Sequence, residues 1–294
     1  MSDSTPRALF CFGLGYTASF LARALAAEGW RVVGTAQTEE GCARLAASGI
    51  EAYRFDREHP LADGATLLGE ATHLLSSVPP EESGDPVLAA HGRDLAALPR
   101  LQWVGYLSTT GVYGDRGGGW VDEESELAPT GERGRRRVAA EAGWRDLHRR
   151  HGRPVHVFRL AGIYGPGRSA LDTVRAGTAR RVHKPGQIFS RIHVEDIVRA
   201  MRASMARPDP GAVYNLCDDD PAPPEAVIAF ACELLGVAPP PLVPLEEARL
   251  SPMARSFYDD SKRVANRRMK EALGVRLRYP SYRDGLRALL GDST

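Results

Sequence analysis

The chain has 294 residues, 43% of them hydrophobic, which is enough to bury a sizeable core in one large domain or in one and a half. Its 38 basic and 37 acidic residues give a formal net charge of +1, so charge offers no case for binding nucleic acid or a membrane surface. The four cysteines have no CxxC spacing, which argues against a metal site and fits a reducing compartment. Because the apolar run after residues 1–7 is too short for a signal peptide or a membrane span, we expect a cytoplasmic protein.

The first elements of the chain predict a βαβ unit. Residues 8–12 form an apolar run typical of a buried strand, and the run breaks at Gly13-Leu14-Gly15. A helical pattern with an apolar face follows and ends at Gly29, and a second strand begins at Arg31.

A G-x-G-x-x-A motif, made by Gly13, Gly15 and Ala18, lies inside this unit. The first glycine permits a tight turn, the second lets the backbone approach a pyrophosphate, and the small alanine lets helix and strand pack closely. The start of the helix then offers free N–H groups and the positive end of its dipole to the phosphates. The position of the motif between a strand and a helix therefore predicts a dinucleotide-binding turn.

The end of the second strand bears on the choice between NAD and NADP. An acidic residue there would bind the ribose 2′-OH of NAD, and a nearby arginine would favour the 2′-phosphate of NADP. Residues 34–38 offer neither, although Thr35, Gln37 and Thr38 could hydrogen-bond either group. Because no carboxylate is present to repel a phosphate, the sequence favours NADP.

Strand-like and helical segments alternate through the first half of the chain. We expect further strands over residues 50–55, 72–78, 101–108 and 155–160, and helices over residues 39–48, 87–98 and 128–151. This rhythm predicts an α/β protein with a doubly wound parallel sheet, a Rossmann fold, whose ligands bind at the carboxyl ends of the strands.

The alternation loosens after Gly165. We expect helices over residues 192–205, 223–235, 262–273 and 282–290, and a strand over residues 212–216. These patterns predict two parts. An NAD(P)-binding Rossmann core would take residues 1–165, with residues 190–216 returning to it, and a smaller C-terminal substrate lobe would take residues 166–189 and 217–294.

Two short segments have competing interpretations. The glycine-rich residues 115–122 are either a mobile loop beside the active-site mouth, with Trp120 covering the ligand, or an ordinary surface loop. The run Asp218-Asp219-Asp220 lacks the spacing of a metal site and is expected to be a solvated turn.

Four segments carry a family resemblance. They read GLGYTA at residues 13–18, STTGVYG at 108–114, RLAGIYGPG at 159–167 and IHVED at 192–196. In this order and spacing, the chain resembles the extended short-chain dehydrogenase/reductases, and within them the NAD-dependent epimerase/dehydratase branch, over nearly its whole length. Its residues depart from that pattern far enough to be called an atypical member.

The resemblance implies cofactor contacts beyond the glycine turn. Asp56 falls where the family contacts the adenine, although a carboxylate there could equally cap a turn. The residues expected to hold the cofactor are Gly13, Gly15, Tyr16, Thr17, Ala18, Thr35, Gln37, Asp56, Ser76, Ser77, Val78, Ser108, Arg137, Gly162 and Ile163.

The resemblance also implies a substrate site. Thr109 falls where the family keeps the Ser or Thr that polarises the substrate oxygen. Thr110, Arg168 and Arg191 are placed to meet a small-molecule substrate, for which a nucleotide sugar is one candidate. Members of this family often form homodimers, so a homodimer is one expectation for this chain.

One departure from the family pattern concerns the chemistry itself. The family normally carries Tyr-x-x-x-Lys on the long helix after the fifth strand, with the phenol as acid and base. The family pattern often has a glutamate four residues after the lysine, and we match it to Glu141. Arg137 then stands at the lysine position and Arg133 at the tyrosine position, and no tyrosine occurs between Tyr113 and Tyr164. An arginine cannot act as a general base near neutral pH, although Arg137 could still bind the ribose.

Two readings of the function follow. In the first, the chain is an NAD(P)-dependent oxidoreductase or epimerase, and Tyr113 or Tyr164 supplies the missing acid and base. In the second, the chain binds NAD(P) without turnover and reports its redox state to a partner. The retained Thr109 and the substrate lobe favour the enzyme, and the missing dyad favours the sensor.

Overall fold

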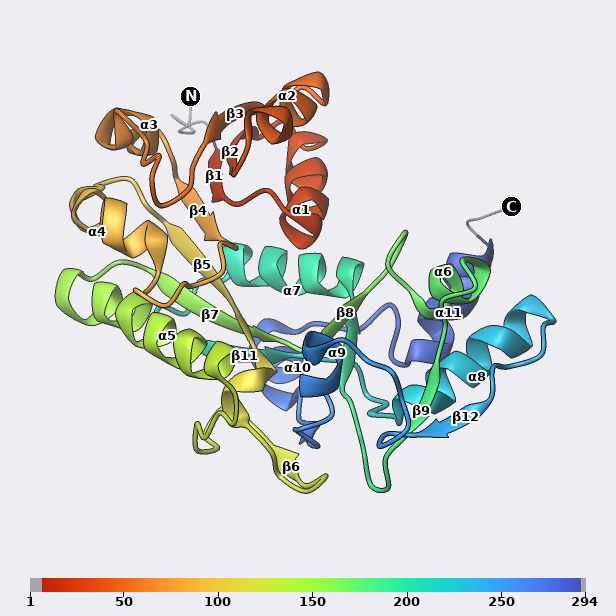
Figure 1. Cartoon of the computed structure of the whole chain (residues 1–294). Helices are drawn as coiled ribbons and strands as arrows, with labels where there is room; N and C mark the ends of the chain where they lie inside the picture. The colour runs from red at the N-terminus through yellow and green to blue at the C-terminus, as the bar shows by residue number, and fades with distance from the viewer. Residues whose placement is uncertain (1–6, 292–294) are drawn as a thin grey trace. The chain divides into compact units, whose positions relative to one another are not determined.

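The computed structural model describes residues 7–291. Within them, a central sheet of seven strands has the order β11-β7-β5-β4-β1-β2-β3 (Figure 1). The pairs β1–β2, β1–β4, β2–β3 and β4–β5 are all parallel, so the predicted doubly wound parallel sheet is confirmed. Its strands are β1 Ala8–Phe12, β2 Arg31–Ala36, β3 Glu51–Arg54, β4 His73–Ser76, β5 Trp103–Thr109, β7 Val155–Leu160 and β11 Val213–Leu216.

The chain forms two compact units. The first takes in the chain as far as Ser108, together with Arg136–Phe158 and Met201–Val213. The second takes in Thr109–Arg135, Arg159–Ala200 and the chain from Tyr214 onward. Compactness does not say which unit binds a substrate, so the boundaries of a substrate lobe stay a prediction.

The first unit buries an apolar core between its strands and helices. Its helices are α1 Tyr16–Ala26, α2 Glu39–Ala47, α3 Gly64–Gly69, α4 Pro86–Ala97 and most of α5, Glu132–His151. Phe12 of β1 and Leu74 of β4 lie in this core with Trp144 of α5, whose ring stacks on Tyr106 of β5 at 5.5 Å between centroids. The Trp144 indole also donates to the carboxylate of Asp85, which caps the start of α4. Helix α5 is thereby held against the sheet.

The second unit is built from short elements. They are the 3₁₀ helix η1 Thr110–Tyr113, the strands β6 Trp120–Val121, β8 Gly162–Tyr164, β9 Arg181–His183, β10 Arg191–His193, β12 Leu242–Pro244 and β13 Arg263–Val264, and the helices α6 Ala170–Arg175, α8 Pro224–Leu235, α9 Pro252–Ser256, α10 Arg267–Leu273 and α11 Tyr282–Gly291. Helix α7, Val194–Ala206, belongs to this unit as far as Ala200 and to the first unit from Met201. The short strands pair as β10–β8, β12–β9 and β13–β6, all parallel. Tyr164, Leu171, Tyr282 and Leu286 lie in its apolar core.

Three predicted helices begin later than expected. The long helix α5 begins at Glu132 rather than at residue 128, because Pro129 disfavours a helical conformation in the residue before it. The helix predicted over residues 192–205 begins at Val194, and the one predicted over 262–273 begins at Arg267. In both cases the preceding residues pair as short strands, β10 with β8 and β13 with β6, and periodicity along the sequence does not reveal such long-range pairing.

The glycine-rich segment after η1 is held in place inside the second unit. The amides of Arg116 and Gly118 donate to the carbonyl of Ser261 at 3.0 and 2.9 Å, and the Ser261 amide donates to the Asp115 carboxylate at 2.7 Å. Trp120 is 64% exposed. These contacts favour the surface loop over the mobile lid.

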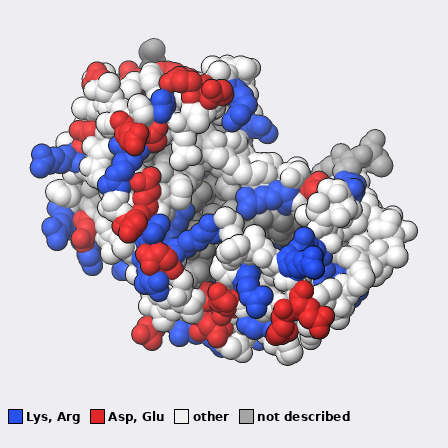
Figure 2. Space-filling view, in the orientation of Figure 1, with Lys and Arg blue, Asp and Glu red and all other residues white. Residues whose placement is uncertain are grey.

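Two further observations concern the charge on the surface and the hydropathy of the helices. On the face drawn in Figure 2, basic and acidic side chains are interspersed. No helix within residues 7–291 is long and apolar enough to cross a membrane.

Candidate functional site

The turn between β1 and α1 presents open backbone. Gly13 has φ +80°, a left-handed conformation that favours glycine. Gly15 is the N-cap of α1 and makes no side-chain cap, and a Cβ added there would meet no atom within 4 Å. Because the first amides of a helix lack partners within it, this open N-terminus suits an anion such as a pyrophosphate. Tyr16, Thr17 and Ala18 form the first turn of this helix.

The same turn is fixed from both neighbouring strands. The Gly13 amide donates to Thr35 Oγ1 of β2 at 2.9 Å, and the Leu14 amide donates to the Thr35 carbonyl at 2.9 Å. From the other side, Ser77 Oγ donates to the Gly13 carbonyl. Gly34 leaves the space that the Leu14 side chain fills, since a Cβ on Gly34 would lie 1.9 Å from Leu14 Cδ1.

The carboxyl ends of β1 and β4 lie side by side at the point where the strand order reverses. Phe12 pairs with Ser76, and Ser77 and Val78 follow directly beside Gly13. Among the described residues, the buried Ser76 hydroxyl has no hydrogen-bond partner. The open glycine turn at this reversal point fits a bound dinucleotide, and the predicted Ser76, Ser77 and Val78 lie beside the turn, with Ser76 fully buried.

Three other predicted cofactor residues lie in different settings. Thr35 is 1% exposed and its hydroxyl faces the glycine turn, whereas Gln37, just after β2, is exposed. Asp56 lies two residues beyond the end of β3, which ends at Arg54 rather than at the expected residue 55. Asp56 Oδ1 accepts from the amides of Glu58 and His59 at 2.8 and 2.9 Å. The hydrogen bond with the His59 side chain, followed by these amides, lowers the pKa of Asp56, and the arrangement favours the turn-capping role.

Helix α5 meets the end of β5 through two polar contacts. Ser108 Oγ donates to Glu141 Oε1 at 2.6 Å, and both side chains are buried. Arg137 Nη1 donates to the Leu107 carbonyl at 2.7 Å and to the Tyr106 hydroxyl at 3.0 Å. Arg133 is exposed. The two arginines at the positions of the missing dyad therefore have different surroundings.

In the second unit, Thr109 and Tyr113 are parts of a local network. Thr109 Oγ1 accepts from the Gly111 amide at 3.1 Å and so caps η1, which begins at Thr110. The Tyr113 hydroxyl donates to Asn215 Oδ1 at 2.7 Å and accepts from Arg159 Nη1 at 2.9 Å. Burial raises the pKa of Tyr113 to about 12. A phenol engaged on both sides and kept protonated is poorly suited to exchange protons with a ligand.

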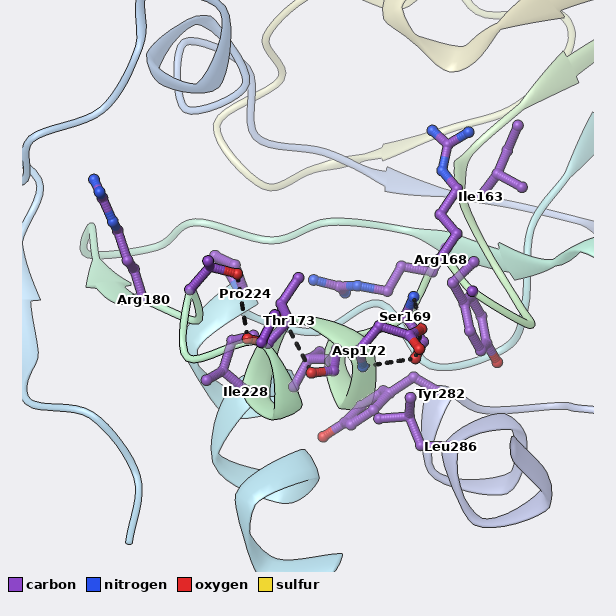
Figure 3. A pocket seen from close by; sticks show the side chains of 17 residues that line it. Ile163, Arg168, Ser169, Asp172, Thr173, Arg180, Pro224, Ile228, Tyr282 and Leu286 are labelled. Carbon is purple, nitrogen blue, oxygen red and sulfur yellow. Dashed lines mark hydrogen bonds between the residues drawn. The ribbon is translucent and has the colours of Figure 1, made fainter. Parts of the chain in front are cut away.

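A cavity of about 630 Å³ lies within the second unit, between α6, α8 and α11 (Figure 3). Its lining includes four predicted site residues: Ile163, Tyr164, Arg168 and Arg191. The residues that line it are Ile163, Tyr164, Gly167, Arg168, Ser169, Ala170, Asp172, Thr173, Ala176, Thr178, Arg180, Arg191, Pro224, Val227, Ile228, Tyr282 and Leu286.

Two charged groups of this lining have internal partners. Asp172 and Ser169 form the capping box of α6, drawn as dashed lines in Figure 3. Arg191 Nη1 donates to the carbonyls of Phe189 and Ala222 at 2.9 and 3.0 Å. Tyr164 donates to the Ser281 carbonyl at 3.3 Å, and burial raises its pKa above the usual range.

Asp218 corrects one expectation. The residue was expected in a solvated turn, but it is 2% exposed, and burial raises the pKa of its carboxyl to about 8. The Asp218 amide donates to the Arg191 carbonyl at 2.6 Å, which draws this segment against β10. A single-sequence pattern cannot separate the first aspartate of such a run from its exposed neighbours.

Sequence reasoning missed two residues of the glycine turn and most of the cavity. Gly34 and Leu14 hold the turn together, and the glycine inside an apolar strand was the available signal, since such a glycine often marks close approach of another chain segment. Tyr282 and Asp172 of the cavity carried no comparable signal.

An open glycine turn at the reversal point of a doubly wound parallel sheet is typical of dinucleotide-binding α/β proteins. Residues 94–217 match the model of the NAD dependent epimerase/dehydratase family. The chain is also 32% identical over 238 residues to Protein YeeZ of Escherichia coli K12, covering 78% of this chain and 84% of that protein. The chain belongs to the NAD dependent epimerase/dehydratase family.

Two solved structures show how widely this fold is shared. A functionally unknown conserved protein from Silicibacter pomeroyi is 55% identical, with a TM-score of 0.88 over 98% of this chain and 99% of that chain. UDP-glucuronic acid 4-epimerase from Bacillus cereus, in complex with UDP-glucuronic acid and NAD, is 16% identical, with a TM-score of 0.74 over 98% of this chain and 100% of that chain. At that identity the second likeness concerns the fold alone.

Proposed function

We propose that this chain is an NAD(P)-dependent oxidoreductase of epimerase/dehydratase type that acts on a hydroxyl- or carbonyl-bearing small molecule. The observation that carries the proposal is the open glycine turn at Gly13 and Gly15, at the carboxyl ends of β1 and β4. The backbone of this turn and the first amides of α1, from Tyr16 to Ala18, would bind the pyrophosphate. A bound nicotinamide supplies a hydride donor or acceptor.

We propose NADP as the preferred form. The end of β2, Thr35-Ala36-Gln37, carries no carboxylate that would repel a 2′-phosphate. The Arg44 guanidinium lies near the end of β2. A Cβ placed on Gly41, at the start of α2, would be 2.8 Å from the Ala36 Cβ and 3.9 Å from Arg44 Nη2.

The remaining sequence-predicted residues keep their proposed roles. Thr109 would orient the substrate oxygen. Arg137 and Ser108 would support the cofactor side from the end of β5, and Gly162 and Ile163 would support the nicotinamide. Thr110, Arg168 and Arg191 would meet the substrate.

We assign proton donation to Tyr164 in preference to Tyr113. Tyr164 lines a cavity and makes one long hydrogen bond, whereas Tyr113 is hydrogen-bonded on both sides. The assignment rests on the position of the Tyr164 phenol in the cavity lining, because burial raises its pKa and makes it a weaker acid than an exposed tyrosine.

The substrate is proposed to be anionic, and a nucleotide sugar is one candidate. Arg168 and Arg191 both line the cavity of about 630 Å³, a volume that can bury a ligand of that size. The Bacillus cereus epimerase of the same fold holds UDP-glucuronic acid together with NAD.

A second function, cofactor binding without turnover, is favoured by one feature. Helix α5 places Arg133 in solvent and engages Arg137 with the Leu107 carbonyl, so neither residue supplies an acid and base there. In that case the protein would report the redox state of NAD(P) to a partner.

A binding-then-turnover experiment separates the two functions. The purified protein is titrated calorimetrically with NAD, NADH, NADP and NADPH, and the preferred form is then incubated with sugar nucleotides and small carbonyl compounds. We expect binding of NADP(H) and a change in absorbance at the nicotinamide band with at least one compound. Turnover would exclude the sensor, and binding without turnover across the whole panel would favour it.

A further inference from the structure

We propose that Thr35 and Ser77 are positioning residues, which hold the glycine turn ready for the pyrophosphate and do not touch the cofactor themselves. The inference rests on the proposed dinucleotide binding. It replaces the sequence-based expectation that these two hydroxyls contact NAD(P) directly, and it makes a different prediction about selectivity between NAD and NADP.

Thr35 is committed to the turn through two of its groups. Its side-chain Oγ1 accepts from the Gly13 amide at 2.9 Å, and its backbone carbonyl accepts from the Leu14 amide at 2.9 Å. Its side chain is 1% exposed, so the hydroxyl has no path to a 2′-phosphate in solvent. Gln37, two residues further along, is the exposed residue at this end of β2.

Ser77 holds the same glycine from the opposite strand. Its Oγ donates to the Gly13 carbonyl, while its own amide donates to the Phe12 carbonyl at 2.9 Å. Both polar groups of Gly13 are therefore occupied within the protein: its amide by Thr35 of β2, and its carbonyl by Ser77, the residue after β4, and by the Gly15 amide at 2.8 Å. The groups proposed to meet an anion are the amides at the start of α1, and their position depends on where Gly13 is held.

The consequence for binding concerns a population of conformations. Glycine has access to many backbone conformations, and the φ of +80° at Gly13 is only one of them. A ligand that needs one conformation binds more weakly in proportion to the fraction of molecules that adopt it. If losing one anchor leaves about a tenth of the molecules competent, affinity falls about tenfold.

The pyrophosphate is common to NAD and NADP, so a positioning role predicts the same fold-loss for both. A direct contact with the 2′-phosphate predicts a loss for NADP alone. The ratio of the two affinities therefore distinguishes the two roles of Thr35.

The chain offers a matched control at the other end of β1. Thr72 is also 1% exposed, its Oγ1 accepts from the Ala8 amide at 3.0 Å, and it donates to the Ala8 carbonyl at 3.1 Å. Thr72→Val removes these two hydrogen bonds and a contact with His73 Nδ1 at 3.0 Å, far from the glycine turn, whereas Thr35→Val removes the side-chain hydrogen bond from the Gly13 amide. Thr72→Val reports what loss of a buried threonine hydroxyl does to stability alone.

The experiment measures dissociation constants for NADH and NADPH, together with melting temperatures, in the full chain. The variants are Thr35→Val, Thr35→Ser, Ser77→Ala and Thr72→Val. We expect Thr35→Val and Ser77→Ala to weaken both cofactors by about tenfold, and Thr35→Ser to restore affinity to within about threefold. Thr72→Val should change affinity less than twofold while lowering the melting temperature at least as much as Thr35→Val does. Should Thr35→Val not fold, the half-buried Ser77→Ala carries the comparison.

Two results overturn the inference while leaving dinucleotide binding intact. The first is wild-type affinity in both Thr35→Val and Ser77→Ala, and the second is a loss confined to NADPH. Failure of the wild-type chain to bind either cofactor is a different outcome, because it overturns the proposed function on which the inference depends.

Discussion

Tyr113→Phe removes a single oxygen from a buried network and separates a structural phenol from a catalytic one. The Tyr113 hydroxyl is the donor to Asn215 Oδ1 and an acceptor for Arg159 Nη1, and all three side chains are buried. Each buried group that loses its partner costs about 1–3 kcal/mol, so the loss of two partners is expected to cost the second unit about 2–6 kcal/mol in stability. If Tyr113 transferred a proton, its removal would lower kcat sharply. Because we assign that role to Tyr164, the Tyr113→Phe variant is expected to keep kcat within about threefold of wild type.

Tyr164→Phe is the matched comparison. That phenol makes a 3.3 Å hydrogen bond to the Ser281 carbonyl, so its removal is expected to cost only about 0.5–1.5 kcal/mol. As the proposed proton donor, however, it should lose about a hundredfold or more in kcat. The assay combines thermal unfolding with NAD(P)H oxidation against an identified substrate. A Tyr113→Phe protein that melts with wild type but no longer turns over would refute the reasoning.

Three further predictions concern packing, charge and helix α5. Gly34→Ala puts a Cβ 1.9 Å from Leu14 Cδ1. We expect the free energy of unfolding, measured by chemical denaturation, to fall by about 1–3 kcal/mol and NADPH to bind more weakly. Unchanged stability and binding would show that Leu14 moves aside freely. Asp218 has its pKa raised to about 8 by burial, so the folded state holds more protons than the unfolded state from about pH 4 to pH 8 and its contribution to stability falls as pH rises through that window. Asp218→Asn should flatten this slope, by at most about 1.4 kcal/mol per pH unit, and an unaltered profile from pH 4 to 8 would contradict the burial argument. Arg137→Met removes the donor to the Leu107 carbonyl and should destabilise the first unit by about 1–3 kcal/mol. Arg133→Met, at an exposed position, should have the wild-type free energy of unfolding in urea. Equal stabilities of the two variants would mean that the contacts of Arg137 contribute nothing.

The features set by local patterns could be predicted from the sequence. The strand over residues 8–12, the glycine turn and the helix behind it form an uninterrupted local signal, and β1 and α1 follow it closely. The alternation of later segments predicted the doubly wound sheet, which depends on the same periodicity. These features need only neighbouring residues to specify them.

The features that depend on distant partners could not be predicted in this way. The strand pairs β8–β10 and β6–β13 are too short to show a period, and each exists because a remote segment lies beside it. The direction of the Thr35 side chain is a similar case. A threonine at a strand end could face solvent or the turn, and only the position of the Gly13 amide decides between them.

The central claim, that the glycine turn binds a dinucleotide, is tested most directly by calorimetric titration of NADPH into the wild-type chain and into Gly15→Ala. Gly15 has φ −80°, and a Cβ there meets no protein atom within 4 Å, so the variant should fold and melt like wild type while its methyl group occupies the space in front of the α1 amides. We predict saturable binding to wild type and at least about tenfold weaker binding to Gly15→Ala. Wild type that binds none of NAD, NADH, NADP or NADPH, or a variant that binds as tightly as wild type, would contradict the account.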